Sequence, residues 1–350
     1  MAGERLSARR LNRTLLLRQH LLTRADLDPP ALAHHLVGLQ AQEPLSPYLS
    51  LAARLASFDP YAVSQALYER RLVRILSLRD TVHLHLPDDA LTMPVWCEPV
   101  RQRERRMSQA IGEARDIDPE EFRAALADVL TGPTPVRRLG DALAERFPGH
   151  RPSALGQLAR VLAPLLQAPP RGAWKSSGGV VYEYVDRWLG RPTAEPHVPD
   201  LVRRYLRAFG PATAADLTAW SGVTRLAPLV RQIPDLVVRE DESGRTLYDV
   251  PDAPLATGEE HAPVRLLGTY DNVWLSHAGK DRVTTPEGRR AWMGAAGGSG
   301  HVLLADGRLE GIWKAVDGRV RIVRLLRDLS PAEEAELAEE TARVEHLLSL

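Results

Sequence analysis

The chain has 350 residues, a length typical of two or three domains of roughly 100 to 200 residues each. Its 45 basic and 45 acidic residues cancel, so net charge favours no class of partner. The single cysteine, Cys97, excludes an internal disulfide and any cysteine-based zinc site, and no run of about 18 apolar residues predicts a membrane span. We therefore expect a cytoplasmic protein that binds no membrane, no metal and no other cofactor.

The first segment reads as helices followed by a hairpin. A helical stripe of leucines over residues 6–22 opposes arginines, and the pair Pro29-Pro30 can open a second helix that runs to Leu39. Further helices are predicted near residues 47–56 and 60–70. The β-rich runs 72–78 and 81–86, joined by Arg79-Asp80, then predict a hairpin.

The same order recurs twice. Helices are predicted over residues 118–130, 135–147 and 152–167, then a hairpin of residues 172–175 and 180–184. A third set has helices over 198–209, 213–220 and on to about 232, then strands at 237–239 and 246–250. Helices followed by a β-wing are typical of a winged helix, so we predict three tandem copies.

The rest of the chain is mostly β in pattern. Strands are predicted at 264–267, 274–276, 301–304, 311–314 and 319–323, and Ser330-Pro331 begins a closing acidic helix. The predicted fold class is mainly α with β (α+β). The predicted domains are residues 1–105, 106–195 and 196–260 as winged helices, and 261–350 as a small β domain with its helix.

Two glutamines lie one residue apart in Gly38-Leu39-Gln40-Ala41-Gln42-Glu43-Pro44. Pro44 disfavours helix at Glu43, and in extended backbone Gln40 and Gln42 share a side. A neutral amide has one acceptor oxygen and two donor protons, so the pair suits holding a water or a base edge. The alternative is a polar helix end, in which the amides only cap free carbonyl groups.

Three motifs together resemble those of the AlkZ-like family, bacterial DNA glycosylases with tandem winged helices. They are the Gln40-Ala41-Gln42 corner, the hairpin Arg79–Leu84, and the stretch Tyr270–Arg282, and the resemblance covers nearly the whole chain. One branch of that family has Gln-x-Gln at the catalytic corner and a broader alkylpurine-repair branch has Gln-x-Asp. This chain has Gln-x-Gln and is therefore similar to the first branch, whose members provide antibiotic resistance.

The resemblance implies a monofunctional glycosylase that hydrolyses the N-glycosidic bond of bulky N7-alkylated purines in double-stranded DNA, including natural-product adducts or interstrand cross-links. Gln40 and Gln42 would be catalytic, because an N7-alkylated purine already carries the positive charge that makes it a good leaving group. Their oxygens can hold a water and face the developing cation. We expect a monomer.

Six other residues are candidates for contact with DNA. Arg79 lies at the predicted hairpin tip, where a phosphate can be reached, and His83 shares a strand face with Thr81. Further candidates lie in the second wing and in the loop after residue 276. These four are Lys175, His277, Lys280 and Arg282. For each of the six the alternative is a purely structural or solvated side chain.

Two other functions remain open from the sequence. Winged helices alone indicate binding, so the chain could be a non-catalytic DNA-binding regulator. It could also be a resistance protein that sequesters a toxin. Release of a modified base, sensitive to substitution of Gln40 and Gln42, would distinguish the enzyme from both.

Overall fold

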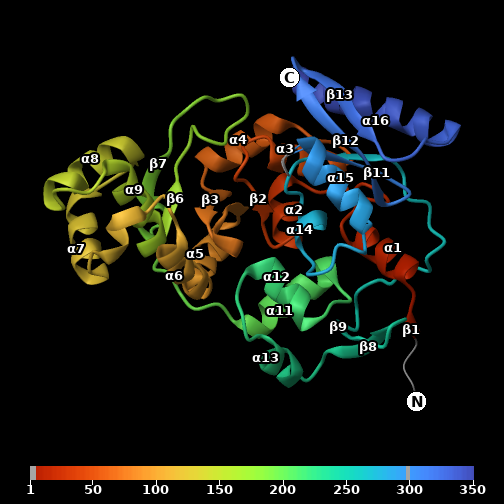
Figure 1. Ribbon diagram of the computed structural model, residues 1–350, viewed down its shortest axis with the longest axis horizontal. Helices are drawn as coiled ribbons and strands as arrows, with labels where there is room; N and C mark the ends of the chain where they lie inside the picture. The colour runs from red at the N-terminus through yellow and green to blue at the C-terminus, as the bar shows by residue number, and fades with distance from the viewer. Residues whose placement is uncertain (1–4, 297–299) are drawn as a thin grey trace. The chain divides into compact units, whose positions relative to one another are not determined.

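The computed structural model describes residues 5–296 and 300–350, and the chain divides into two compact units (Figure 1). The first unit contains the residues up to Pro60, then His197–Trp220 and Thr224–Leu350. The second contains Tyr61–Pro196 and Ser221–Val223. Helices and short strands occur in both units, which confirms the predicted α+β class. The division into three winged helices and a β domain stays a prediction.

The first unit begins with helices that the leucine pattern predicted. The Ser7 side chain accepts a hydrogen bond from the Arg10 amide and so caps the first helix. Arg18 at the end of that helix pairs with Asp249 at 2.7 Å, and both side chains are buried. The two strands predicted near residues 237–239 and 246–250 are confirmed as the antiparallel hairpin β8–β9, and β8 also pairs in parallel with β1. The elements of this part are β1 (Arg5–Leu6), α1 (Ala8–Arg18), α2 (Pro29–His35), β2 (Leu39–Gln40), α3 (Ser46–Arg54), α11 (Val198–Phe209), α12 (Ala214–Ser221), α13 (Ala227–Gln232), β8 (Val237–Asp241) and β9 (Thr246–Asp249).

The C-terminal part of this unit is built on an antiparallel sheet in the order β10-β11-β12-β13. Four of the five predicted strands are confirmed. The prediction of a strand over residues 274–276 is wrong, because the Asp271 side chain accepts a hydrogen bond from the Val273 amide and caps a short helix. The elements are β10 (Arg265–Leu267), α14 (Asn272–Leu275), α15 (Pro286–Ala296), β11 (His301–Ala305), β12 (Arg308–Val316), β13 (Arg319–Leu325) and α16 (Pro331–Ser349).

The acidic helix α16 packs against its own unit. Ser330 and Glu333 form a capping box at its start, as the Ser-Pro-Ala-Glu sequence predicts. Arg343 donates to the Leu55 carbonyl oxygen at 2.6 Å and so satisfies the end of α3. Glu340 is buried and pairs with Arg24. Much of the acidic charge of α16 is therefore used in contacts within the unit.

The second unit contains strands in the order β4-β3-β6-β7-β5. Strands β3 and β4 form the predicted antiparallel hairpin. The predicted hairpin of residues 172–175 and 180–184 is wrong, since β7 pairs with β6 and residues 172–175 form a turn. Gly172 has φ +89° and packs against the Arg74 side chain, leaving no room for a Cβ atom. The strands are β3 (Val73–Leu76), β4 (Val82–His85), β5 (Thr134–Pro135), β6 (Leu165–Gln167) and β7 (Val181–Tyr184).

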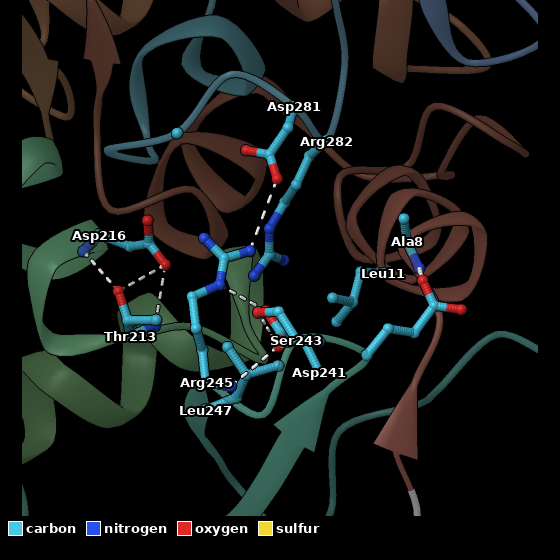
Figure 2. Close-up of a pocket in the computed structure, with 12 residues that line it drawn as sticks. Ala8, Leu11, Thr213, Asp216, Asp241, Ser243, Arg245, Leu247, Asp281 and Arg282 are labelled. Atoms are coloured by element: carbon cyan, nitrogen blue, oxygen red, sulfur yellow. Dashed lines mark hydrogen bonds and ion pairs between the residues drawn. The ribbon is translucent and has the colours of Figure 1, made fainter.

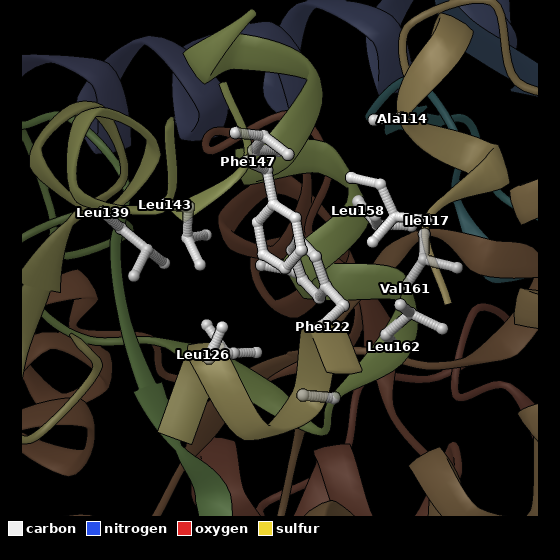
Figure 3. Close-up of a cluster of buried hydrophobic side chains, with 14 of the residues drawn as sticks. Ala114, Ile117, Phe122, Leu126, Leu139, Leu143, Phe147, Leu158, Val161 and Leu162 are labelled. Atoms are coloured by element: carbon white, nitrogen blue, oxygen red, sulfur yellow. The ribbon is translucent and has the colours of Figure 1, made fainter. Parts of the chain in front are cut away.

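A helical core lies beside this sheet in the same unit. Phe122 and Phe147 stack with ring centroids 5.4 Å apart, surrounded by buried leucines of α7, α8 and α9 (Figure 3). Helix α9 ends at Leu162, five residues before the predicted end, because Pro164 follows and the next residues join the sheet. Helices α5 and α6 were not predicted, since prolines interrupt their pattern. The helices are α4 (Pro60–Tyr68), η1 (Leu78–Asp80), α5 (Pro87–Trp96), α6 (Glu98–Met107), η2 (Gly112–Asp116), α7 (Pro119–Val129), α8 (Val136–Arg146), α9 (Pro152–Leu162) and α10 (Val185–Leu189).

Candidate active site

The paired glutamines follow a turn in left-handed backbone. Helix α2 ends at His35, before the predicted end, and Val37 and Gly38 then have φ 54° and 97°. The Gly38 amide donates to the Ala33 carbonyl oxygen at 2.8 Å, which closes the last turn of the helix. A left-handed conformation is unfavourable for a β-branched residue such as Val37. The chain therefore leaves α2 through a strained turn and becomes extended at Leu39–Gln40.

The two glutamines differ in exposure. The Gln40 side chain is buried, with 7% exposed, whereas Gln42 is exposed. Ala41 between them is fully buried, which anchors the corner in the first unit. A buried amide dipole acts more strongly on a nearby charge than one in water, and an exposed amide can reach a large ligand. That both side chains face one water stays a prediction.

Asp271 and Asn272, from the third motif of the sequence, support this corner. The Asn272 side-chain amide donates to the Gly38 carbonyl oxygen at 2.8 Å. Asp271 receives two hydrogen bonds from Arg54 of α3, at 2.7 and 2.8 Å, and one from Ser50 at 2.5 Å. Burial alone would raise the pKa of Asp271, but Arg54, Ser50 and its own helix cap lower it below the ordinary value. The carboxylate is therefore ionised at neutral pH.

No sequence pattern assigned Arg54 or Ser50 to the site. Both lie on α3, which begins just after the glutamine corner, but Arg54 is 217 positions from its partner Asp271 in the chain. The available signal was an arginine in a predicted helix of mostly apolar residues, because a charge that becomes buried in such a helix requires a partner. The sequence could not identify that partner.

The hairpin candidates of the second unit are more enclosed than expected. Arg79 and Asp80 at the tip both have positive φ, and Arg79 is partly buried and contacts the His83 ring at 3.2 Å. His83 is 1% exposed and stacks on His85, with ring centroids 5.7 Å apart. Burial raises the pKa of the Asp80 carboxyl to about 6, although Arg160 lies 3.7 Å away. Contact of Arg79 or His83 with DNA stays a prediction.

Lys175 is exposed in the turn that replaces the predicted second hairpin. Its backbone has φ 50°, and its ammonium group lies 5.8 Å from the centroid of the Trp174 ring. Trp174 is buried, and its backbone amide donates to Ser64 at 2.8 Å. An exposed lysine on a tightly held turn remains suited to a phosphate contact.

The cluster of His277, Lys280 and Arg282 is built into the first unit. The His277 ring contacts the Phe209 carbonyl oxygen at 3.1 Å, and burial, with Arg282 nearby, lowers the pKa of His277 to about 3. Lys280 donates to the His277 carbonyl oxygen at 2.6 Å. Arg282 donates to the Pro211 carbonyl oxygen at 2.6 Å. The structure brings the three residues together, and each makes a hydrogen bond to a backbone carbonyl oxygen of this unit. Their contact with DNA stays a prediction.

Arg282 also lines a cavity of about 140 Å³ beside the β8–β9 wing (Figure 2). Arg245 lies between Asp241, at 2.6 Å, and Asp281, at 3.6 Å. Carboxylates outnumber guanidinium groups in this cavity, so it does not favour a phosphate. The acidic lining residues are Asp216, Asp241, Glu242 and Asp281.

Residues 33–347 match the family described as DNA glycosylase AlkZ-like. The chain belongs to this family. An interstrand DNA cross-link repair glycosylase of Streptomyces sahachiroi is 27% identical over an alignment of 327 residues, and this alignment covers 86% of this chain and 85% of that protein. The solved structure of the DNA glycosylase AlkZ of Streptomyces sahachiroi aligns with a TM-score of 0.77 at 22% identity, and covers 99% of this chain and 98% of that one.

Membership of the AlkZ-like DNA glycosylases confirms the family and the enzyme class that the sequence motifs predicted. The solved structure confirms the fold as well. No helix among the described residues is both long and apolar enough to cross a bilayer. Within residues 5–296 and 300–350, no three or more His, Cys, Asp or Glu side chains are grouped to hold a metal ion.

Proposed function

We propose that this AlkZ-like glycosylase hydrolyses the N-glycosidic bond of bulky N7-alkylated purines in double-stranded DNA, including natural-product adducts and interstrand cross-links. The observation that carries the proposal is the Gln40-Ala41-Gln42 corner, found in a chain that belongs to a DNA glycosylase family. Asn272 holds the backbone that leads into this corner. The relative named as a cross-link repair glycosylase supports the cross-link as a substrate.

Two neutral amides suit this substrate. In the reaction the bond between C1′ and N9 breaks and its electron pair neutralises the cationic purine, so the leaving group needs no acid. A water oxygen bonds to C1′, and the proton that it loses passes to solvent. The oxygens of Gln40 and Gln42 hold that water and present negative dipole ends to the oxocarbenium-like transition state. Because amides are poor bases, ordinary nucleosides with poor leaving groups should not react.

Because water is the nucleophile in this proposal, the enzyme is monofunctional and leaves an abasic site. The six candidate contacts at Arg79, His83, Lys175, His277, Lys280 and Arg282 are proposed to serve the DNA rather than the reacting bond. Cys97 is a buried free thiol, which fits a reducing cytoplasm. We infer that the protein acts as a monomer, which sedimentation at the assay concentration can test.

The test uses duplex DNA that carries defined N7-guanine adducts, from methyl to a cross-link, followed by alkaline cleavage of abasic sites. Gln40→Ala and Gln42→Ala should each slow single-turnover release by about 100- to 1,000-fold, the range for removing one preorganised dipole. The matched control is Gln232→Ala, an exposed glutamine at the end of α13. No release from any adduct, with DNA binding unchanged in all three variants, would instead support a DNA-binding regulator.

A further inference from the structure

Asn272 makes a buried hydrogen bond to the backbone that leads into the glutamine corner. Its side-chain amide donates to the Gly38 carbonyl oxygen at 2.8 Å, across 234 positions of sequence. The Asn272 side chain is itself buried, with 5% exposed. Removing a buried donor leaves the carbonyl oxygen without that hydrogen bond in a site that water does not readily enter. This contact is therefore well placed to hold the Gly38 peptide group in one orientation.

The corner needs such a restraint because its backbone is strained. Val37 and Gly38 have positive φ, and left-handed backbone at a β-branched residue persists only when surrounding contacts hold it. Gly38 is two residues before Gln40, so rotation of the Gly38 peptide would redirect the extended segment Leu39–Gln40. A shift of about 1 Å in a group near the reacting atoms can cost about 100-fold in rate.

The donor is held as firmly as the acceptor. Asn272 is the first residue of α14, and the Asp271 carboxylate caps this helix. Asp271 is bound by Arg54 and Ser50 of α3, the helix that begins just after the corner. Asn272 is thus bonded to the segment before Gln40, and its neighbour Asp271 to helix α3 after it.

We infer that Asn272 is a positioning residue for Gln40, acting through the Gly38 carbonyl group without touching the substrate. The inference rests on the proposed function of Gln40. It adds a role for the Asp-Asn pair of the third motif, in which Asp271 orients Asn272, and Asn272 sets the direction of the catalytic amide.

The experiment measures single-turnover base release from duplex DNA with an N7-alkylguanine, at saturating enzyme, between pH 5.5 and 8. Asn272→Asp is nearly isosteric, but a carboxylate cannot donate to the Gly38 oxygen and repels it. We expect a loss of about 10- to 100-fold at pH 8. As the pH falls the new carboxyl group takes up a proton and can donate again, so the variant should regain rate relative to the wild type. Asn272→Ala should be slow at every pH.

Asn12 provides a matched control in the same unit. It is buried, with 3% exposed, and its side-chain amide donates to the carbonyl oxygens of Arg282 at 2.6 Å and Gly307 at 2.8 Å. Asn12→Asp removes the same kind of donor away from the corner. Its single-turnover rate should match the wild type at each pH, whatever it does to thermal stability.

The double variant Gln40→Ala, Asn272→Ala decides whether the two residues act together. It should be no slower than Gln40→Ala alone, because misplacing an absent amide costs nothing further. The inference would be overturned if the double variant lost rate by the product of the two single losses. It would also be overturned if Asn272→Asp kept the wild-type rate while Gln40→Ala was inactive. Either result would leave the proposed function standing. If Gln40→Ala itself keeps the wild-type rate, the proposed catalytic role fails first. Should Asn272→Asp not fold, Asn272→Ala and the double variant decide in the same way.

Discussion

Replacing Asp271 by asparagine should be among the most destabilising single changes in the first unit. The carboxylate accepts hydrogen bonds from Arg54, from Ser50 and from the Val273 amide, at distances of 2.5 to 3.0 Å. The side chains of Arg54 and Asp271 are 0% and 1% exposed. Asparagine keeps the shape and one oxygen but removes the negative charge, so the guanidinium group of Arg54 stays buried without its counterion.

The expected loss is about 3 to 5 kcal/mol, the usual cost of removing one partner of a buried ion pair. Coulomb's law gives a similar size, about 4 kcal/mol for unit charges 4 Å apart at an effective dielectric of 20. The pKa of Asp271 is lowered in the folded state, so this stabilisation is complete above the ordinary value of 3.8 and is lost as the pH falls through the lowered pKa. At pH 7 the full effect should be present.

Urea unfolding at pH 7, followed by circular dichroism, measures this loss. The control is Glu287→Gln, which removes an exposed ion pair with Arg290 and should leave the urea midpoint unchanged. The double variant Arg54→Met, Asp271→Asn removes both charges and should recover much of the loss. A loss below about 1 kcal/mol in Asp271→Asn, or a double variant no more stable than the single one, would refute the reasoning.

Three further predictions concern other parts of the chain. Because the pKa of His277 is about 3 when folded and 6.5 when unfolded, the unfolded chain binds more protons between these values, so stability decreases as the pH is lowered through this window. His277→Gln should therefore lose about 2 kcal/mol less than the wild type between pH 7 and 5 in urea titrations; an equal loss would contradict this. Phe122→Ala should destabilise the helical core of the second unit by about 3 to 5 kcal/mol, as measured by thermal unfolding, and a loss under 1 would be inconsistent with the stacked ring. Lys175→Ala should weaken DNA binding and reduce the slope of log affinity against log salt by about 1, whereas an unchanged slope would exclude a phosphate contact.

Periodicity in the sequence predicted most elements of this protein. Helices α1, α8 and α11 follow apolar residues at helical spacing, and the hairpin β3–β4 follows β-rich runs around a short turn. These features are local, since a residue needs only its near neighbours to adopt them. The three sequence motifs also sufficed for the family and the enzyme class.

Contacts distant in sequence decided where local patterns failed. Residues 172–175 have strand-like neighbours, but Gly172 must turn against Arg74 of another strand. Val273, Trp274 and Leu275 favour a strand by composition, yet they form a helix that Asp271 caps, and Arg54, 217 positions away, holds Asp271 in place. In both places a contact distant in sequence holds a conformation that differs from the weak local preference.

The glutamine corner depends on both levels. Its residues, and the reason why two amides suit a cationic purine, were available from the sequence alone, whereas the roles of Asp271 and Asn272 were not. Only the tertiary structure joined them, through the bond from Asn272 to Gly38 and the pairing of Asp271 with Arg54. Sequence spacing carries no information about such pairs, because the chain between them can fold in many ways until the whole core is packed.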